Sequence, residues 1–191
     1  ESIQSSALNT NVSATIPVSA LNAMKVNNIC RGERRCFVTV PSVSGYDMNA
    51  QALVARVTGV NALQIQNHTA DTVDPELTRF AVDMTAETLT LWFDEPISTA
   101  SLNASFITFQ SEASIAGAQS HTLSHSQSTT SSANGTQLVV DLGIEDLNEI
   151  KRLSGLAQNL ATSHISLEAG AVYDMVGLAL VAANISTDGY T

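Results

Sequence analysis

Long apolar runs, aromatic residues and charges are all scarce in this chain. No apolar run approaches the roughly 18 residues of a membrane-spanning helix, so we expect no membrane span. Aromatic residues make up 5 % of the chain and charged residues 14 %, whereas 44 % of the residues are hydrophobic, which is enough for a substantial core. With abundant Ser and Thr, these proportions are typical of a β-rich surface module rather than of a cytosolic enzyme.

Motifs for catalysis are also missing. The sequence has no nucleophile elbow, no glycine-rich phosphate loop and no HExxH zinc motif. His121 and His125 have a spacing that would suit a metal on a helix, but they lie in a Ser/Thr-rich stretch with no carboxylate nearby, so we expect no metal there. An isoelectric point of 4.6 disfavours nucleic acid, because an acidic domain repels phosphate. We therefore expect neither an enzyme nor a nucleic-acid-binding protein.

What the sequence does contain is an internal repeat. Residues 5–25 match residues 131–151 at seven of 21 positions, with an offset of 126. Residues 46–55 match residues 173–182 at seven of ten positions, with an offset of 127. The chain therefore holds about one and a half copies of a unit of roughly 120 residues, and residues 5–57 correspond to its second half.

Alternation of apolar and polar residues predicts strands along most of the chain. The expected strands are marked by Leu63 and Ile65, by Phe80, Val82 and Met84, by Leu89, Leu91 and Phe93, by Ile107 and Phe109, by Leu138, Val140 and Leu142, by Ile165 and Leu167, and by Leu178, Leu180 and Ala182. Residues 144–157 instead have apolar residues at helical spacing, with acidic residues first and basic residues last, which predicts a helix. The first copy repeats this pattern at 18–26.

These motifs resemble the tandem Ig-like repeats of large secreted and surface proteins of aquatic microbes, of the kind that builds extracellular glycoprotein fibrils. The residues that carry the resemblance are Asp74, Pro75, Leu77, Phe80, Asp83, Leu89, Leu91, Phe93, Glu95, Ser101, Leu102, Asn103, Leu147, Asn148, Ile150, Lys151, Asp174, Met175 and Gly177. The resemblance implies an all-β fold of Ig-like β-sandwich repeats, each with one short crossing helix, and a structural or adhesive role without catalysis. The expected domains are an incomplete repeat at 1–57, a linker with a leading strand at 58–75, a full repeat at 76–183 and a tail at 184–191.

Carboxylates gather where the full repeat begins. Asp71, Asp74 and Glu76 precede its first strand, and Asp94 and Glu95 adjoin Pro96 at a strand end. Extracellular repeat junctions use such groups for Ca²⁺, although no Asp-x-Asp-x-Asp spacing is present. We expect no cofactor, with Ca²⁺ bound by these carboxylates as the alternative.

The only two cysteines, Cys30 and Cys36, are close enough in sequence to form a disulfide around a small loop. Free thiols or half of a metal site are the alternatives, but two thiols alone are too few ligands for a metal. A disulfide implies an oxidising compartment, and we expect an extracellular or cell-surface location. The start at Glu1, without Met or a leader, fits a processed mature product.

Five N-x-S/T sequons predict N-linked glycans if the chain passes through a eukaryotic secretory pathway. Their acceptor residues are Asn11, Asn67, Asn103, Asn134 and Asn184, and all fall at expected turns or strand edges. The Ser/Thr-rich stretch 120–132 is either a carrier of O-linked sugars or a polar hairpin loop.

The charges are unevenly distributed. Residues 1–57 carry a net charge of +2 and residues 58–191 carry −12, which gives the overall −10. Arg31, Arg34 and Arg35 all lie between the two cysteines. A basic head and an acidic body attract each other between molecules, so these arginines are candidates for assembly contacts, unless the loop is simply a solvated tip.

Half of a β-sandwich exposes an apolar face and open strand edges. We therefore expect a structural subunit of an extracellular glycosylated fibril, in which copies of the chain join head-to-tail by completing the N-terminal half repeat. The alternative is a spacer or adhesion repeat cut from a long tandem-repeat surface adhesin, where the missing half precedes this segment in the same polypeptide. The expected partners are other copies of the chain and covalent glycans.

Overall fold

The computed structural model describes residues 3–4, 13–186 and 189–190, and the chain divides into two compact units. Unit 1 comprises residues 1–71 and unit 2 comprises residues 72–191. The stretch 58–75, expected as a linker, is thus shared between the two units. Among the described residues, no helix is long and apolar enough to cross a membrane.

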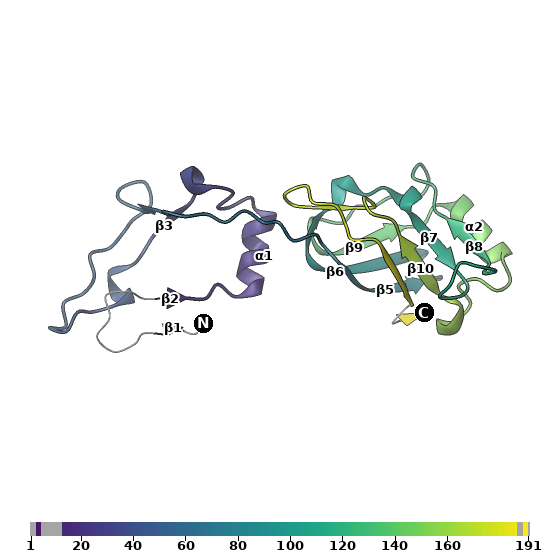
Figure 1. Ribbon diagram of the computed structural model, residues 1–191, viewed down its shortest axis with the longest axis horizontal. Coiled ribbons are helices and arrows are strands. Elements are labelled where there is room, and N and C mark those ends of the chain that lie inside the picture. The colour runs from purple at the N-terminus through teal and green to yellow at the C-terminus, as the bar shows by residue number, and fades with distance from the viewer. Residues whose placement is uncertain (1–2, 5–12, 187–188, 191) are drawn as a thin grey trace. The chain divides into compact units, whose positions relative to one another are not determined.

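Unit 2 consists of two β-sheets that pack together, with one helix (Figure 1). In the first sheet, strands run in the order β11-β6-β5-β13, and β9 also pairs with β6. In the second sheet the order is β12-β10-β7-β8. The elements are β5 (Leu77–Asp83), β6 (Thr88–Ser98), η3 (Thr99–Ser101), η4 (Ala104–Phe106), β7 (Ile107–Gln110), β8 (Ser120–Thr122), β9 (Gly135–Asp141), α2 (Ile144–Arg152), η5 (Leu160–Thr162), β10 (His164–Leu167), β11 (Tyr173–Asp174), β12 (Ala183–Ser186) and β13 (Gly189–Tyr190).

Period-two alternation positions the core of unit 2. Strands β5, β6 and β9 pair in antiparallel register, so that Val82, Leu89 and Val140 lie side by side and are all buried. The neighbouring row, formed by Asp83, Thr88 and Asp141, points to the opposite face of the sheet. Buried residues of the second sheet and of α2 complete the same hydrophobic cluster.

Unit 1 contains few regular elements. They are β1 (Ile3–Gln4), β2 (Ser13–Ala14), α1 (Val18–Val26), η1 (Glu33–Arg35), β3 (Phe37–Val38), η2 (Ser42–Ser44) and β4 (Leu63–Gln64). Strand β1 pairs with β2 and strand β3 pairs with β4, each as an isolated antiparallel pair. A disulfide joins Cys30 to Cys36.

The repeat that the sequence contains is also a repeat of local structure. With an offset of 126, α1 coincides residue by residue with α2, and with an offset of 127, η1 coincides with η5. Asp47 Oδ1 accepts hydrogen bonds from the backbone N–H groups two and four residues later, at 2.8 Å each. Asp174 Oδ1 accepts the two equivalent bonds, at 2.9 and 2.7 Å. Residues 1–71 contain no counterpart of residues 72–126.

Unit 2 is mostly β, as predicted, but several boundaries differ. The helix expected at 144–157 ends at Arg152, because Leu153 is extended and a turn follows in which the Leu156 N–H donates to the Leu153 carbonyl. No strand forms at 178–182. The Leu180 and Val181 N–H groups there donate to Val172 and to Pro75, which lie in different segments, so no continuous ladder develops.

Candidate functional site

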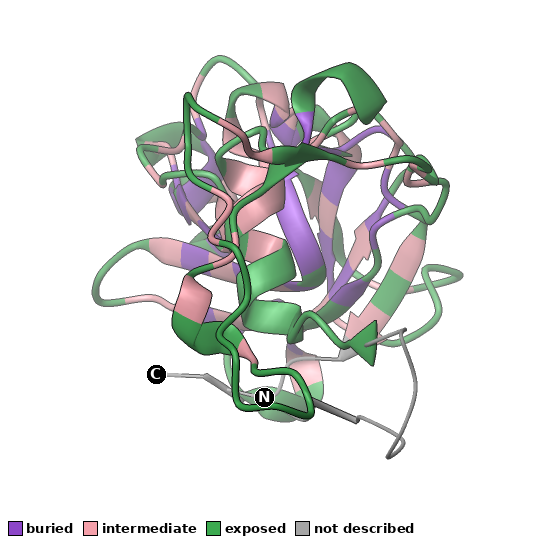
Figure 2. Ribbon diagram, turned by 90° about the vertical axis from the view of Figure 1, so that its left-hand side faces the viewer, coloured by how far each residue is buried: buried purple, intermediate pink, exposed green. Residues whose placement is uncertain are grey.

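Unit 1 has almost no core of its own. Among residues 13–71, Cys36 is the only hydrophobic residue that is buried, and α1 has no buried residue. Figure 2 shows buried residues in purple along the strands that form the core of unit 2. The large hydrophobic side chains that are exposed in unit 1 are Ile16, Val18, Leu21, Ile29, Phe37, Val38, Val43, Tyr46, Met48, Leu53, Val54, Val57, Val60 and Leu63. Unit 2 is larger, but among its described residues it has half as many exposed large hydrophobic side chains.

The same repeat positions are exposed in unit 1 and buried in unit 2. In unit 1 four apolar side chains are 41–53 % exposed, whereas their counterparts in unit 2 are at most 7 % exposed. The pairs are Ile16 and Leu142, Leu21 and Leu147, Val38 and Ile165, and Leu53 and Leu180. These unit 1 residues thus have the identity and the local backbone of core residues without a core around them.

Unit 2 shows which part of the repeat packs against these positions when they are buried. Twelve of the 24 residues in its hydrophobic cluster come from the segment 72–126 that unit 1 lacks. Strand β10 is paired on one side with β12 and on the other with β7, which belongs to that segment. Its counterpart β3 pairs only with β4 in the described part of the chain, so the edge that corresponds to the β7 side has no strand beside it. Unit 1 therefore exposes, next to a strand edge, the repeat positions that in unit 2 share one core with residues 72–126. We call these positions, marked by Ile16, Leu21, Val38 and Leu53, the acceptor face.

The three arginines of the disulfide loop lie together in unit 1. Arg31, Arg34 and Arg35 are exposed and line, with Glu33 and His68, an open pocket of about 460 Å³. The Gln64 side chain donates a 3.0 Å hydrogen bond to the Glu33 carbonyl, which connects the loop to strand β4. The loop is thus held at its two ends by the disulfide and in its middle by β4.

The sequons occupy different environments. Asn67 and Asn134 are exposed, and Asn134 Oδ1 accepts hydrogen bonds from the N–H and the hydroxyl of Thr99 at 3.0 Å. Asn103 Oδ1 caps η4 by accepting from Ser105. Asn184 Nδ2, the atom that a glycan would modify, donates a 2.7 Å hydrogen bond to the Ala113 carbonyl. Asn11 lies outside the described residues.

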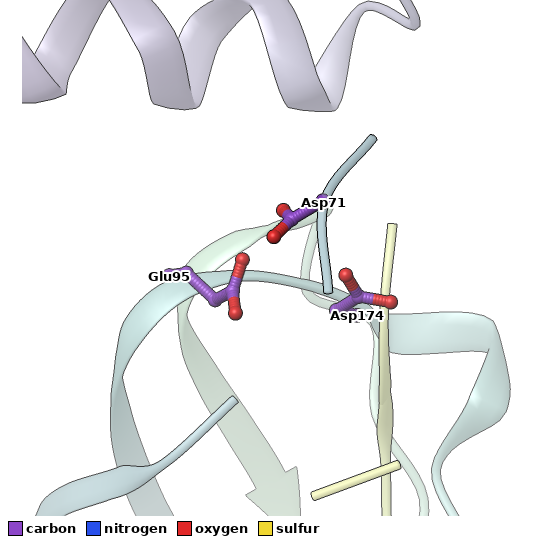
Figure 3. Close-up of side chains that lie close together, drawn as sticks. All are labelled: Asp71, Glu95 and Asp174. Atoms are coloured by element: carbon purple, nitrogen blue, oxygen red, sulfur yellow. The ribbon is translucent and has the colours of Figure 1, made fainter. Parts of the chain in front are cut away.

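Glu95 is one of the carboxylates that we expected near a repeat junction. In the structure its carboxylate lies close to that of Asp174, within unit 2 (Figure 3). Both are buried, and their carboxylate oxygens lie within 4.8 Å of each other. Asp71, which Figure 3 also labels, is the last residue of unit 1. Asp174 Oδ1 already accepts two backbone hydrogen bonds, whereas Ca²⁺ needs about six to eight oxygen ligands. Asp94, instead, is exposed and accepts from the Glu76 N–H at 2.8 Å.

One buried polar network is not indicated by the sequence pattern. We expected no carboxylate near His121, but Asp146 Oδ1 lies 2.9 Å from His121 Nε2. Asp146 Oδ2 accepts from the Ser124 N–H at 2.9 Å and from the Ser128 hydroxyl at 2.7 Å. The expectation was wrong because Asp146 is 25 residues away in sequence and reaches β8 through the fold. This network fixes α2 to the segment 120–128, and its three donors occupy the carboxylate.

Comparisons of the chain with family models, with curated proteins and with solved structures found no match. Its function therefore has to be argued from its own two units.

Proposed function

We propose that this chain is a structural subunit of an extracellular, glycosylated fibril, in which a second copy of the chain covers the acceptor face and completes unit 1 as an Ig-like β-sandwich. The observation that carries the proposal is the exposure of repeat positions that are buried in unit 2. A Leu, Ile or Val side chain gains roughly 1.5–3 kcal/mol on full burial, so half-exposed side chains each retain about half of that for association.

A strand edge and an apolar face favour β-augmentation as the mode of contact. An added strand would satisfy the backbone groups of β3 on the side where β10 is paired with β7, and its alternate side chains would cover Val38 and Leu21. In this proposal the covering surface of one copy is a different part of the chain from the acceptor face of the next. Such a heterologous contact, repeated from copy to copy, generates an open filament rather than a closed dimer.

Hydrogen exchange followed by mass spectrometry tests the completion of unit 1. In dilute monomer we expect fast exchange through 13–71 and slow exchange in β5, β6 and β9, because the unit 1 backbone lacks a core above it. On assembly, protection should appear at α1 and β3. A monomer in which α1 and β3 are already as protected as β6 would show that unit 1 is complete by itself and would contradict the proposal.

Electron microscopy of native material, combined with the intact mass before and after deglycosylation, tests the fibril. Regular filaments built from a polypeptide near 20.1 kDa plus sugar are the expected result. A single polypeptide of several hundred kilodaltons would instead mean that the missing half lies in the same chain, and the protein would then be a spacer or adhesion repeat.

The glycan part of the proposal concerns mainly Asn67 and Asn134, since Asn184 is also exposed but its Nδ2 donates to Ala113. Asn134 uses its Oδ1, and not its Nδ2, in its hydrogen bonds with Thr99, whereas a glycan on Asn184 would break the hydrogen bond that its Nδ2 donates to the Ala113 carbonyl. Glycopeptide mapping should therefore find Asn67 and Asn134 occupied and Asn184 unmodified. Native material without any sugar at these sites would remove the glycan from the proposal and leave the assembly contact to be judged separately.

A further inference from the structure

The arginine loop, residues 31–35, is a feature that distinguishes unit 1 from its own repeat. At the positions of Arg31, Arg34 and Arg35, unit 2 has Gln158, Ala161 and Thr162. The backbone around them is the same, because η1 and η5 occupy equivalent positions. The repeat therefore forms this turn without arginine, so the three arginines are a feature of unit 1 that its local backbone does not require.

The pocket beside this loop has the character of a site for carboxylates. Three exposed guanidinium groups line this open pocket, whose volume is about 460 Å³, and the carboxylate of Glu33 offsets only one of their three positive charges. Guanidinium groups form short, charge-assisted and often bidentate hydrogen bonds with carboxylates. The disulfide and the Gln64 hydrogen bond restrict the loop, which reduces the entropy lost when a partner binds.

The chain itself has the matching surface. Unit 1 has five basic and four acidic groups, a net charge of +1, whereas unit 2 has three basic and fourteen acidic groups, a net charge of −11. At one end of the first sheet of unit 2, Asp83 and Asp141 flank Thr88 on adjacent strands. Glu87, in the turn between β5 and β6, and Glu145, in the first turn of α2, belong to the same end. We call these four residues the acidic end, and Lys151 is 3.7 Å from Glu87 within it.

The acidic end lies away from the residues that link unit 2 to unit 1. Strand β5 begins at Leu77, shortly after the unit boundary, and reaches Asp83 after seven residues, a rise of about 20 Å. The exposed carboxylates Asp74 and Glu76 lie at the opposite, linked end of this strand. A partner that approaches the acidic end thus meets carboxylates at a surface that the covalent connection does not use.

From these observations we infer that the arginine loop of one copy binds the acidic end of unit 2 of the next copy, and that this contact sets the head-to-tail polarity of assembly. The inference rests on the proposed function, because it names the second surface of the same assembly. Burial of the apolar acceptor face would stabilise the contact, while the arginines would select which end of the neighbouring copy approaches. Like charges would oppose a contact between two arginine loops or between two acidic ends.

Charge reversal in the full chain tests this pairing. R34E/R35E and D141K/E145K change exposed side chains on the two proposed surfaces, and D74K/E76K is the matched control at the linked end of unit 2. Self-association is measured by sedimentation velocity at low and at high salt, with electron microscopy of the products. Each of the first two variants should weaken association at least ten-fold, and the control variant should associate as the wild type does.

A mixture of the two weakened variants provides the decisive result. Every contact in an alternating copolymer would then be either the native pair or a Glu–Lys pair, so an equimolar mixture should recover association. A mixture that stays dissociated, or R34E/R35E that assembles like the wild type, would overturn the inference while leaving the proposed function intact. Wild-type chain that assembles only after an acidic polysaccharide such as alginate is added would also overturn it. Wild-type chain that never self-associates, with α1 and β3 unprotected throughout, would instead overturn the proposed function.

Discussion

Helices α1 and α2 are equivalent nine-residue elements in two different surroundings. Each begins after an extended residue, and the last turn holds Lys25 in α1 and Lys151 and Arg152 in α2. Leu147 on α2 is 1 % exposed, whereas its counterpart Leu21 on α1 is 41 % exposed. The comparison shows that local sequence is enough to define the helix, the following 3-10 turn and the Asp turn, while burial depends on a segment that only unit 2 contains.

The largest expected effect concerns Leu147 and its counterpart Leu21. L147A should lower the free energy of unfolding of unit 2 by about 2–5 kcal/mol, because a buried leucine leaves a cavity. The matched variant L21A should change monomer stability by less than about 0.5 kcal/mol, because the side chain is already half in water. Urea unfolding followed by the fluorescence of Trp92, the single tryptophan and a residue of β6, measures the loss for L147A, and amide exchange along α1 measures the loss for L21A. Equal losses for the two variants would show that unit 1 has a core.

The second prediction concerns the buried carboxylate of α2. D146A removes the acceptor for His121, Ser124 and Ser128, so it should cost about 3 kcal/mol in the same unfolding assay. The corresponding position in unit 1 is Ala20, which makes A20D the natural control, and this variant should leave the Trp92 transition unchanged. A loss below about 0.5 kcal/mol for D146A, a small fraction of a typical domain stability, would mean that the network does not hold α2 in place.

The third prediction separates the covalent constraint of unit 1 from the core of unit 2. Replacing both cysteines, as C30A/C36A, should ease opening of the loop by roughly 2 kcal/mol, as expected for a short disulfide ring. Amide exchange across 30–36 should accelerate, and the Trp92 transition should not move. A shift of that transition would indicate that the loop stabilises unit 2.

The smallest expected effect concerns the shared Asp turn. Gly177 has a φ of +95°, and its counterpart Ala50 also has a positive φ, of 61°. G177A should destabilise unit 2 by about 1 kcal/mol, because a Cβ is disfavoured in this region. A50G should relax the turn of unit 1 and slow its amide exchange slightly. An unchanged melting temperature for G177A would show that the turn adapts to alanine without cost.

Much of the local structure could be predicted from the sequence. The offset between the copies located α1, because its pattern reproduces that of α2, and alternation located β5, β6, β7, β9 and β10. The spacing of Cys30 and Cys36 predicted the disulfide that the structure contains. These features depend on interactions between near neighbours or on the period of a strand, both of which are written in short windows of sequence.

Long-range contacts were the part that sequence could not supply. Short windows did not indicate that Asp146 accepts from His121, or that Glu95 lies beside Asp174, since each pair is brought together by strand topology. Strand β8 was missed because Ser, His and Thr are as typical of a polar loop as of an exposed edge strand. The false strand at 178–182 has the right alternation, but the Asp174 turn commits its backbone groups to two different partners.

The disulfide has a consequence for the kinetics of partner binding. Cys36 is the only buried hydrophobic residue in the described part of unit 1, so covalent bonding, rather than packing, keeps its loop in shape before any partner is present. A preformed loop can be recognised in the first encounter, with no folding step ahead of it, and association then proceeds at a rate set by diffusion and charge. In a reducing medium the same surface would have to fold while it binds, and growth of an assembly would slow even if its final stability were unchanged.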